Sequence, residues 1–174
     1  PRSRGLGDVY KRQGLSSLAP ENTMAAFRCA VDHQVKWVEA DVDVIADGTV
    51  IICHDSTLDR TTNRTGRYDD LTAADLAGID AGGWFSPRFV GEPLPALSDL
   101  IDLMNDSGLN ANIEIKPNET GKEATLRLID GVLTQLERPR PDGKVIVTPP
   151  EDVTPGSYPV EVEITRPDKD PSKA

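Results

Sequence analysis

The chain has 174 residues and a formal net charge of −10, which fits a single acidic domain with a core of its own. An acidic surface argues against nucleic acid or an anionic membrane as a partner. No stretch approaches the roughly 18 apolar residues of a membrane span, so no stable membrane anchor is expected. The two cysteines, Cys29 and Cys53, fall in apolar segments and are expected to be reduced core residues, which points to a cytoplasmic protein.

Composition divides the sequence into three parts. Residues 1–13 carry four basic residues against one acid and show no helical or strand periodicity, so we predict a non-native or disordered segment. Residues 14–138 carry the periodic segments of a folded domain. Residues 139–174 hold eight of the fourteen prolines, which favours loops, an edge strand or a disordered tail, although residues 160–164 alternate like a strand.

The central part alternates between helical and strand patterns. In chain order, the predicted elements are a helix opening at 20–23, strands at 36–45 and 49–53, a capping box at 72–75, a helix capped by Ser98 and ended by Gly108, a strand at 112–116 and a helix over 124–136. The alternation favours an α/β fold with a parallel sheet, in which chemistry gathers at the carboxyl ends of strands. The Asp47-Gly48 dipeptide favours a local antiparallel hairpin instead, and the sequence leaves both arrangements open.

Acidic residues at strand positions are the strongest chemical signal. Glu39 and Asp41 alternate on one strand and therefore share a face, as Glu114 and Lys116 do on a later strand. Carboxylates beside apolar strand residues are costly to bury without a cation, and Mg²⁺ or Ca²⁺ prefers oxygen ligands. The alternative is that these acids lie on the solvated face of an antiparallel sheet. We expect a divalent cation held by Glu39, Asp41 and Glu114, with His54 and Lys116 beside it, an arrangement suited to attack on a phosphate ester.

Several blocks of residues also occur in the order and spacing of one known family. The blocks are Leu18-Ala19-Pro20-Glu21-Asn22-Thr23, Glu39-Ala40-Asp41-Val42, Asp47-Gly48, His54-Asp55, Arg60-Thr61-Thr62, Asp80-Ala81-Gly82, Trp84-Phe85, Glu92-Pro93-Leu94-Pro95 and Ile113-Glu114-Ile115-Lys116. Together they extend from about Gly14 to about Leu136, and over this range the chain resembles the glycerophosphodiester phosphodiesterases.

The resemblance implies a fold and an activity. The fold is a TIM-type (β/α) barrel, and the activity is hydrolysis of glycerophosphodiesters to glycerol 3-phosphate and an alcohol with Mg²⁺ or Ca²⁺. A histidine suits this chemistry because it can pass a proton to a leaving alkoxide near neutral pH. The implied roles are metal binding by Glu39, Asp41 and Glu114, acid–base catalysis by His54 as one of two histidines, and phosphate or substrate binding by Lys116, Glu21 and Asn22.

Two departures from the family pattern affect this expectation. The family opens its first loop with His-Arg-Gly, where this chain has Arg12-Gln13-Gly14, so the first catalytic histidine and the adjacent phosphate-binding arginine are absent. The strand expected before that loop is replaced by residues 1–13, and four more strand–helix units would follow Leu136. The chain is also shorter than the roughly 250 residues of a typical barrel. We therefore expect an incomplete barrel with impaired activity.

Two other interpretations stand beside this one. A non-catalytic or truncated remnant would still bind a divalent cation or phosphate, because Arg12 stands where a proton-transfer histidine is expected. A phospholipase D-like toxin of the same barrel type would be secreted and disulfide-bonded, and this chain lacks the spaced cysteines. The expected partner is a small glycerophosphodiester, with the alcohol, the choice of ion and the oligomeric state left open.

Overall fold

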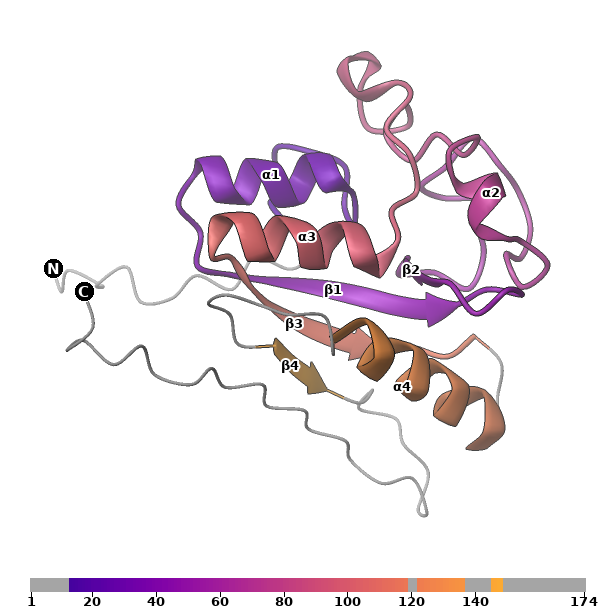
Figure 1. Ribbon diagram of the computed structural model, residues 1–174. Helices are drawn as coiled ribbons and strands as arrows, with labels where there is room; N and C mark the ends of the chain where they lie inside the picture. Colours follow the sequence, from indigo (N-terminus) through magenta and orange to yellow (C-terminus); the bar gives the residue numbers. More distant parts are fainter. Residues whose placement is uncertain (1–12, 119–121, 137–144, 149–174) are drawn as a thin grey trace, which may run out of the picture.

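The computed structural model of the protein describes residues 13–118, 122–136 and 145–148 (Figure 1). None of the helices in these ranges is long and apolar enough to cross a membrane. The elements are α1 (Met24–Asp32), β1 (Trp37–Val44), β2 (Val50–Ile52), α2 (Ala73–Leu76), the short 3₁₀ helix η1 (Pro87–Phe89), α3 (Leu97–Ser107), β3 (Asn110–Ile115), α4 (Lys122–Leu136) and β4 (Val145–Thr148).

Two predictions for the ends of the sequence fall largely outside the described residues. Of the segment predicted to be non-native or disordered, only Gln13 is described, and the predicted strand at 160–164 is not. Within the proline-rich part, where loops, an edge strand or disorder were expected, the structure has the short strand β4 at one edge of the sheet.

The sheet contains both arrangements that the sequence left open. Its strand order is β2-β1-β3-β4, with β1, β3 and β4 parallel to one another and β2 antiparallel to β1. The Asp47-Gly48 turn closes the β1–β2 hairpin, where Gly48 has φ 85°. The α/β expectation is confirmed, and the described strands form an open sheet rather than a closed barrel.

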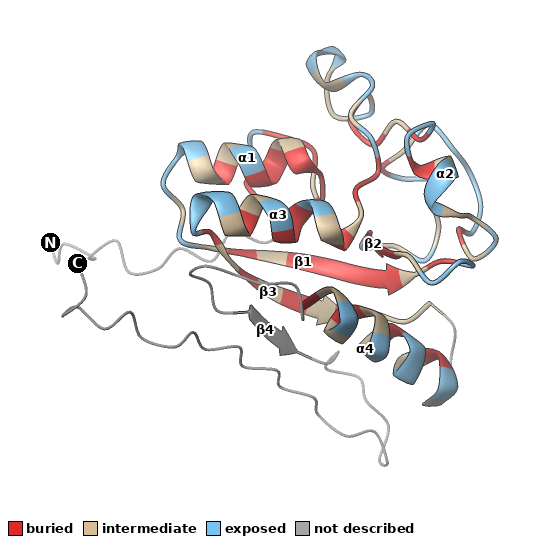
Figure 2. Ribbon diagram, in the orientation of Figure 1, coloured by how far each residue is buried: buried red, intermediate tan, exposed pale blue. Residues whose placement is uncertain are grey.

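One face of this sheet is apolar and is covered by helices. Alternate residues of β1, among them Val38 and Val42, pack in one core cluster with those of β3, among them Ala111 and Ile113. The cluster also contains the buried sides of α1, α3 and α4. Figure 2 shows that these helices turn exposed residues away from the sheet, while β1 is buried along most of its length. The opposite face of β1 and β3 therefore carries the other alternate set, which is polar.

A second, smaller core lies on the polar face beside β2. It is formed by apolar residues of the long excursion between β2 and α3, including Leu58, Tyr68 and Ile79, which pack against Ile51 and Cys53. Cys53 is buried and Cys29 is half-buried, and neither is in a disulfide. This excursion covers the carboxyl end of β1 and leaves Glu39 and Glu114 only half-buried.

One predicted helix start agrees with the structure and one was wrong. The first helix begins at Met24 and is capped by Thr23, the last residue of the predicted opening at 20–23, because the residues before it form a turn in which Asn22 has φ 53°. α3 is capped at Ala96 and not at Ser98, because the Asp99 carboxylate accepts a hydrogen bond from the Ala96 N–H over 2.9 Å. Gly108 ends α3 in a left-handed conformation, as predicted.

Candidate metal centre

Three carboxylates from two neighbouring strands meet on the polar face of the sheet. Glu39 and Asp41 lie on β1, and Asp41 is the direct register partner of Glu114 on β3. One carboxylate oxygen from each of the three residues lies within 4.8 Å of the others. The predicted convergence of Glu39, Asp41 and Glu114 is therefore present in the structure.

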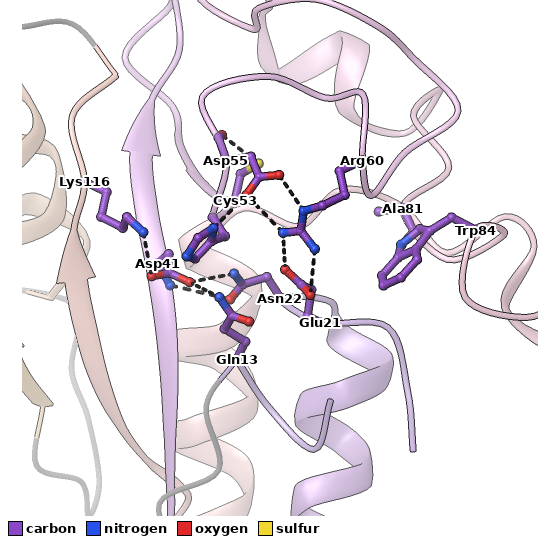
Figure 3. A network of polar contacts seen from close by, with 11 residues as sticks. Gln13, Glu21, Asn22, Asp41, Cys53, Asp55, Arg60, Ala81, Trp84 and Lys116 are labelled. Atoms are coloured by element: carbon purple, nitrogen blue, oxygen red, sulfur yellow. Dashed lines mark hydrogen bonds and ion pairs between the residues drawn. The ribbon is translucent and has the colours of Figure 1, made fainter. Parts of the chain in front are cut away.

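Asp41 is the most buried member of this cluster, with 1% of its surface exposed. Its Oδ2 accepts hydrogen bonds from Gln13 Nε2 at 2.9 Å and Asn22 Nδ2 at 2.8 Å. Its Oδ1 is buried and has no hydrogen-bond donor among the described residues. Lys116 Nζ, at 3.7 Å from Oδ1, makes a longer charge contact (Figure 3). A buried carboxylate oxygen without a donor is costly, which indicates that a cation completes its surroundings.

Glu114 provides a second sign of unbalanced negative charge. Burial and the neighbouring Asp41 carboxylate raise the pKa of Glu114 above its ordinary value, while Lys116 opposes this rise. One ammonium group does not offset three carboxylates. Hard divalent cations bind several carboxylate oxygens at once, so the donor set and the Asp41 Oδ1, which has no hydrogen-bond donor among the described residues, fit Mg²⁺ or Ca²⁺ held by Glu39, Asp41 and Glu114.

The first loop holds two amide side chains on Asp41. Asn22 adopts φ 53°, and its N–H donates to the Gln13 carbonyl over 3.0 Å. Gly14 also has positive φ, and a Cβ at this position would lie 2.7 Å from the Ala26 Cβ, so the loop can approach α1 only with glycine here. Asn22 was predicted to bind substrate, and the structure adds that it orients a carboxylate of the cluster.

His54 reaches the same region because the hairpin turns back. β2 runs antiparallel to β1, and the Cys53 N–H donates to the Asp41 carbonyl over 3.0 Å, which brings the next residue to the level of the cluster. His54 Nδ1 lies 2.7 Å from Asp55 Oδ1, and 41% of the histidine side chain is exposed. A carboxylate on one ring nitrogen leaves the other nitrogen available for proton transfer.

Arg60 connects the loop of His54 with the loop before α1. Its guanidinium contacts Asp55 at 2.6 and 3.0 Å and Glu21 at 2.5 and 3.0 Å (Figure 3). The contacts of Asp55 with Arg60 and with His54 lower the pKa of Asp55 to about 2. Glu21, predicted to bind substrate, therefore engages an arginine that also holds the loop of His54.

Asp43, which the sequence interpretation did not single out, forms another buried polar group. Its carboxylate accepts hydrogen bonds from Val44 N at 2.7 Å, Tyr68 Oη at 3.0 Å and Asn118 N at 2.7 Å. Burial raises the pKa of Asp43 despite these donors. The alternation of Glu39 and Asp41 continues to Asp43 and could have identified it. The sequence marked Gln13 only as a departure from the family pattern and gave no signal for Asn118, because the partners of both residues are distant in sequence.

Similar proteins match more than half of this chain. A glycerophosphodiester phosphodiesterase of Caldanaerobacter subterraneus subsp. tengcongensis is 40% identical over 108 residues, which are 62% of this chain and 44% of that protein. A Bacillus subtilis glycerophosphodiester phosphodiesterase is 36% identical over 118 residues, covering 62% of this chain and 39% of that protein.

Solved structures of phosphodiesterases also match this chain. A phosphodiesterase of Oleispira antarctica, in complex with the product sn-glycerol-3-phosphate, matches with a TM-score of 0.76 and 32% identity over 83% of this chain and 57% of that chain. A glycerophosphodiester phosphodiesterase of Agrobacterium tumefaciens matches with a TM-score of 0.64 and 30% identity over 82% of this chain and 58% of that chain. The chain thus spans about half the length of the proteins it matches.

The sequence pattern of a whole family agrees with these individual matches. The glycerophosphoryl diester phosphodiesterase family model matches residues 13–144, which include the first loop, the acidic cluster, His54 and Lys116. The chain belongs to the glycerophosphoryl diester phosphodiesterase family.

Proposed function

We propose that this site binds Mg²⁺ or Ca²⁺ through Glu39, Asp41 and Glu114 and belongs to an enzyme that hydrolyses glycerophosphodiesters to glycerol 3-phosphate and an alcohol. The observation that carries the proposal is the buried Asp41 Oδ1, which lacks a hydrogen-bond donor among the described residues and lies within a cluster of three carboxylates. Family membership and the product complex of the Oleispira antarctica relative support the choice of substrate. We propose that the complete fold is a TIM-type barrel, of which the described sheet is a part.

The residues around the cluster have separable roles in this reaction. Lys116 extends its ammonium toward the cluster, where it binds a phosphate oxygen of the substrate. His54, held by Asp55, exchanges a proton with the oxygen of the leaving alcohol. Arg60 keeps Asp55 ionised and holds it in place, since it binds Glu21 at the same time. When bound, the divalent cation supplies positive charge to the phosphate oxygens.

A second candidate function is binding without turnover. The family has an arginine at the position of Gln13, and here the Gln13 amide donates to Asp41 Oδ2, so it supplies no charge for a phosphate. Arg12, in place of the first catalytic histidine, cannot act as a proton-transfer group at neutral pH because the pKa of arginine is too high. A chain with these residues binds a cation or phosphate and leaves the ester intact.

Thermal unfolding with and without millimolar Ca²⁺ or Mg²⁺ tests the cation site. Binding only to the folded chain at a hundred times the dissociation constant stabilises it by about 2.7 kcal/mol, which raises the unfolding temperature. Glu114→Gln should remove this response, whereas Glu123→Gln, in the first turn of α4, should retain it. An unchanged response in Glu114→Gln would contradict the cation assignment.

Turnover of glycerophosphocholine separates the two candidate functions. The present chain is compared with an Arg12→His, Gln13→Arg variant, each alone and within a chain given a full barrel. Turnover that appears only after both residues are restored supports an enzymatic site that these residues have disabled. Absence of turnover in the restored full barrel, with cation binding intact, favours the binding function.

A further inference from the structure

Asn118 lies in the loop between β3 and α4, two residues after Lys116, and makes an unusually complete set of hydrogen bonds. Its backbone N–H donates to Asp43 Oδ2 over 2.7 Å. Its side-chain Nδ2 donates to the Ser56 carbonyl at 3.0 Å and to Asp69 Oδ1 at 3.2 Å, and its Oδ1 accepts from Arg67 Nη1 at 3.3 Å. Both ends of the amide are therefore engaged.

These partners come from three segments that carry the candidate site. Asp43 follows Asp41 on β1, Ser56 lies two residues after His54, and Asn118 itself follows Lys116. Arg67 and Asp69 belong to the excursion, and Arg67 also pairs with Asp69. Asn118 thus joins the ends of β1 and β3 to the loop of His54.

The connection from Asn118 to Lys116 is short and stiff. The Lys116 N–H donates to the Val42 carbonyl over 3.0 Å, which fixes the backbone on the strand side. Pro117 has a fixed φ angle and also restricts the conformation of the residue before it. With the Asn118 backbone bound to Asp43 and its side-chain amide bound to the Ser56 carbonyl and Asp69, the Lys116 backbone is held on both sides, which limits where its long side chain can place the ammonium group.

We propose that Asn118 is a positioning residue that holds Lys116 toward the acidic cluster and so sets the affinity of the site for the phosphate group of its ligand. The inference rests on the proposed function, because it takes Lys116 as the phosphate-binding residue. In this proposal Asn118 acts on the ligand through Lys116 and not by direct contact.

The test is a double-mutant cycle on binding, which needs no turnover. Glycerol 3-phosphate is titrated by calorimetry into the 174-residue chain with saturating Ca²⁺, for the unmodified chain, Asn118→Ala, Lys116→Met and the double variant. We expect each single variant to bind about tenfold more weakly and the double variant to be no weaker than Lys116→Met, since residues that act through one another are not additive. The Ca²⁺ affinity of Asn118→Ala should be unchanged.

Asn110→Ala is the matched control, because Asn110 is the first residue of β3, at the opposite end of the strand, and its amide also donates to a backbone carbonyl, that of Lys36, at 3.1 Å. This variant should lose stability without losing glycerol 3-phosphate affinity. Both Asn118→Ala and Asn118→Ser keep the backbone N–H that binds Asp43 and remove only the side-chain amide. If Asn118→Ala does not fold, the polar Asn118→Ser variant takes its place and should show the same weakening.

Three outcomes would overturn the inference. Unchanged glycerol 3-phosphate binding in folded Asn118→Ala, with Lys116→Met weakened, would reject it while leaving the proposed function in place. Additive losses in the double variant would show that Asn118 does not act through Lys116. Glycerol 3-phosphate binding that is absent in the unmodified chain, or unaffected by Lys116→Met, would overturn the proposed anion site and this inference together.

Discussion

Two regions at the carboxyl half of β1 hold buried aspartates in opposite ways. Asp41 and Asp43 share a face and are 1% and 3% exposed. Asp43 receives three hydrogen bonds that engage both oxygens, whereas Asp41 has one buried oxygen without a hydrogen-bond donor among the described residues and two other carboxylates nearby. Burial alone therefore does not separate a structural acid from a ligand. The difference lies in whether the protein itself satisfies the carboxylate.

The largest effect is expected when Asp43, the aspartate whose two oxygens both accept hydrogen bonds, is replaced. Asp43→Ala leaves the Tyr68 hydroxyl and the Asn118 N–H without their acceptor, and we expect a loss of about 3 kcal/mol in the free energy of unfolding. Urea denaturation measures it. Asp106→Ala, at an exposed position of α3, should change stability by less than about 0.5 kcal/mol. A loss for Asp43→Ala no larger than that of the control would remove the distinction between the two aspartates.

The second prediction concerns Asp41, which has one buried oxygen without a hydrogen-bond donor among the described residues. Without a divalent cation, Asp41→Asn should not destabilise the chain, because it removes one of three crowded negative charges. With Ca²⁺ at a hundred times the dissociation constant, it should lose the full stabilisation of about 2.7 kcal/mol. Differential scanning calorimetry in chelator and in Ca²⁺ gives both values. Strong destabilisation in chelator would show that Asp41 is a structural acid like Asp43.

A milder change at Asp43 tests the same comparison. Tyr68→Phe removes one of the three hydrogen-bond donors to Asp43. We expect a loss of about 1 kcal/mol in the free energy of unfolding, with no change in the Ca²⁺-induced stabilisation. Gln13→Ala makes the matching change at Asp41, where Asn22 remains as a donor to Oδ2, and should alter the Ca²⁺ response. Isothermal titration of Ca²⁺ into both variants distinguishes the two regions, and equal Ca²⁺ affinities would contradict the separation.

The smallest effect is expected at Asp55, whose carboxylate is paired with the exposed guanidinium of Arg60. Arg60→Ala should cost less than about 1 kcal/mol at neutral pH, since 47% of the arginine side chain is exposed. Because Arg60, together with His54, lowers the pKa of Asp55 to about 2, these contacts stabilise the fold above the ordinary pKa of 3.8, and this contribution is lost as the pH falls toward 2.

Unfolding curves between pH 5 and pH 2 test whether the stabilisation by Arg60 falls with decreasing pH. The stability difference between the unmodified chain and Arg60→Ala should be constant near pH 5 and shrink as the pH falls toward 2. Arg28→Ala, at an exposed position of α1, provides the control and should run parallel to the unmodified chain. A difference that grows with acidity would contradict the assignment of Arg60 to Asp55.

Local patterns determined most of the secondary structure and one half of the candidate site. Strand alternation placed Glu39 and Asp41 on a common face, and the apolar stripe of α4 and the left-handed Gly108 were readable because each depends on residues within a turn or two. The start of α3 was misread because Ser98 is a common cap, while the acceptor that decides the cap is the side chain of Asp99.

The family motifs indicated candidate residues for the site but not their arrangement. The meeting of Asp41 with Glu114 depends on the parallel register of β1 and β3, which lie far apart in the sequence. Likewise, the antiparallel sense of the β1–β2 hairpin decides that His54 returns to the level of Asp41. Strand register and direction follow from the packing of whole faces against helices, which no short segment encodes.

The sequence by itself thus determined which residues carry charge, which faces they occupy and which family the chain resembles. Only the tertiary structure decided that one Asp41 oxygen lacks a hydrogen-bond donor among the described residues while Asp43 has several, and that Arg60 and Asn118 join separate loops. The physical reason is that hydrogen-bond satisfaction of a buried group is set by donors from distant segments, here Gln13, Asn22, Tyr68 and Asn118, whose approach depends on the folded backbone.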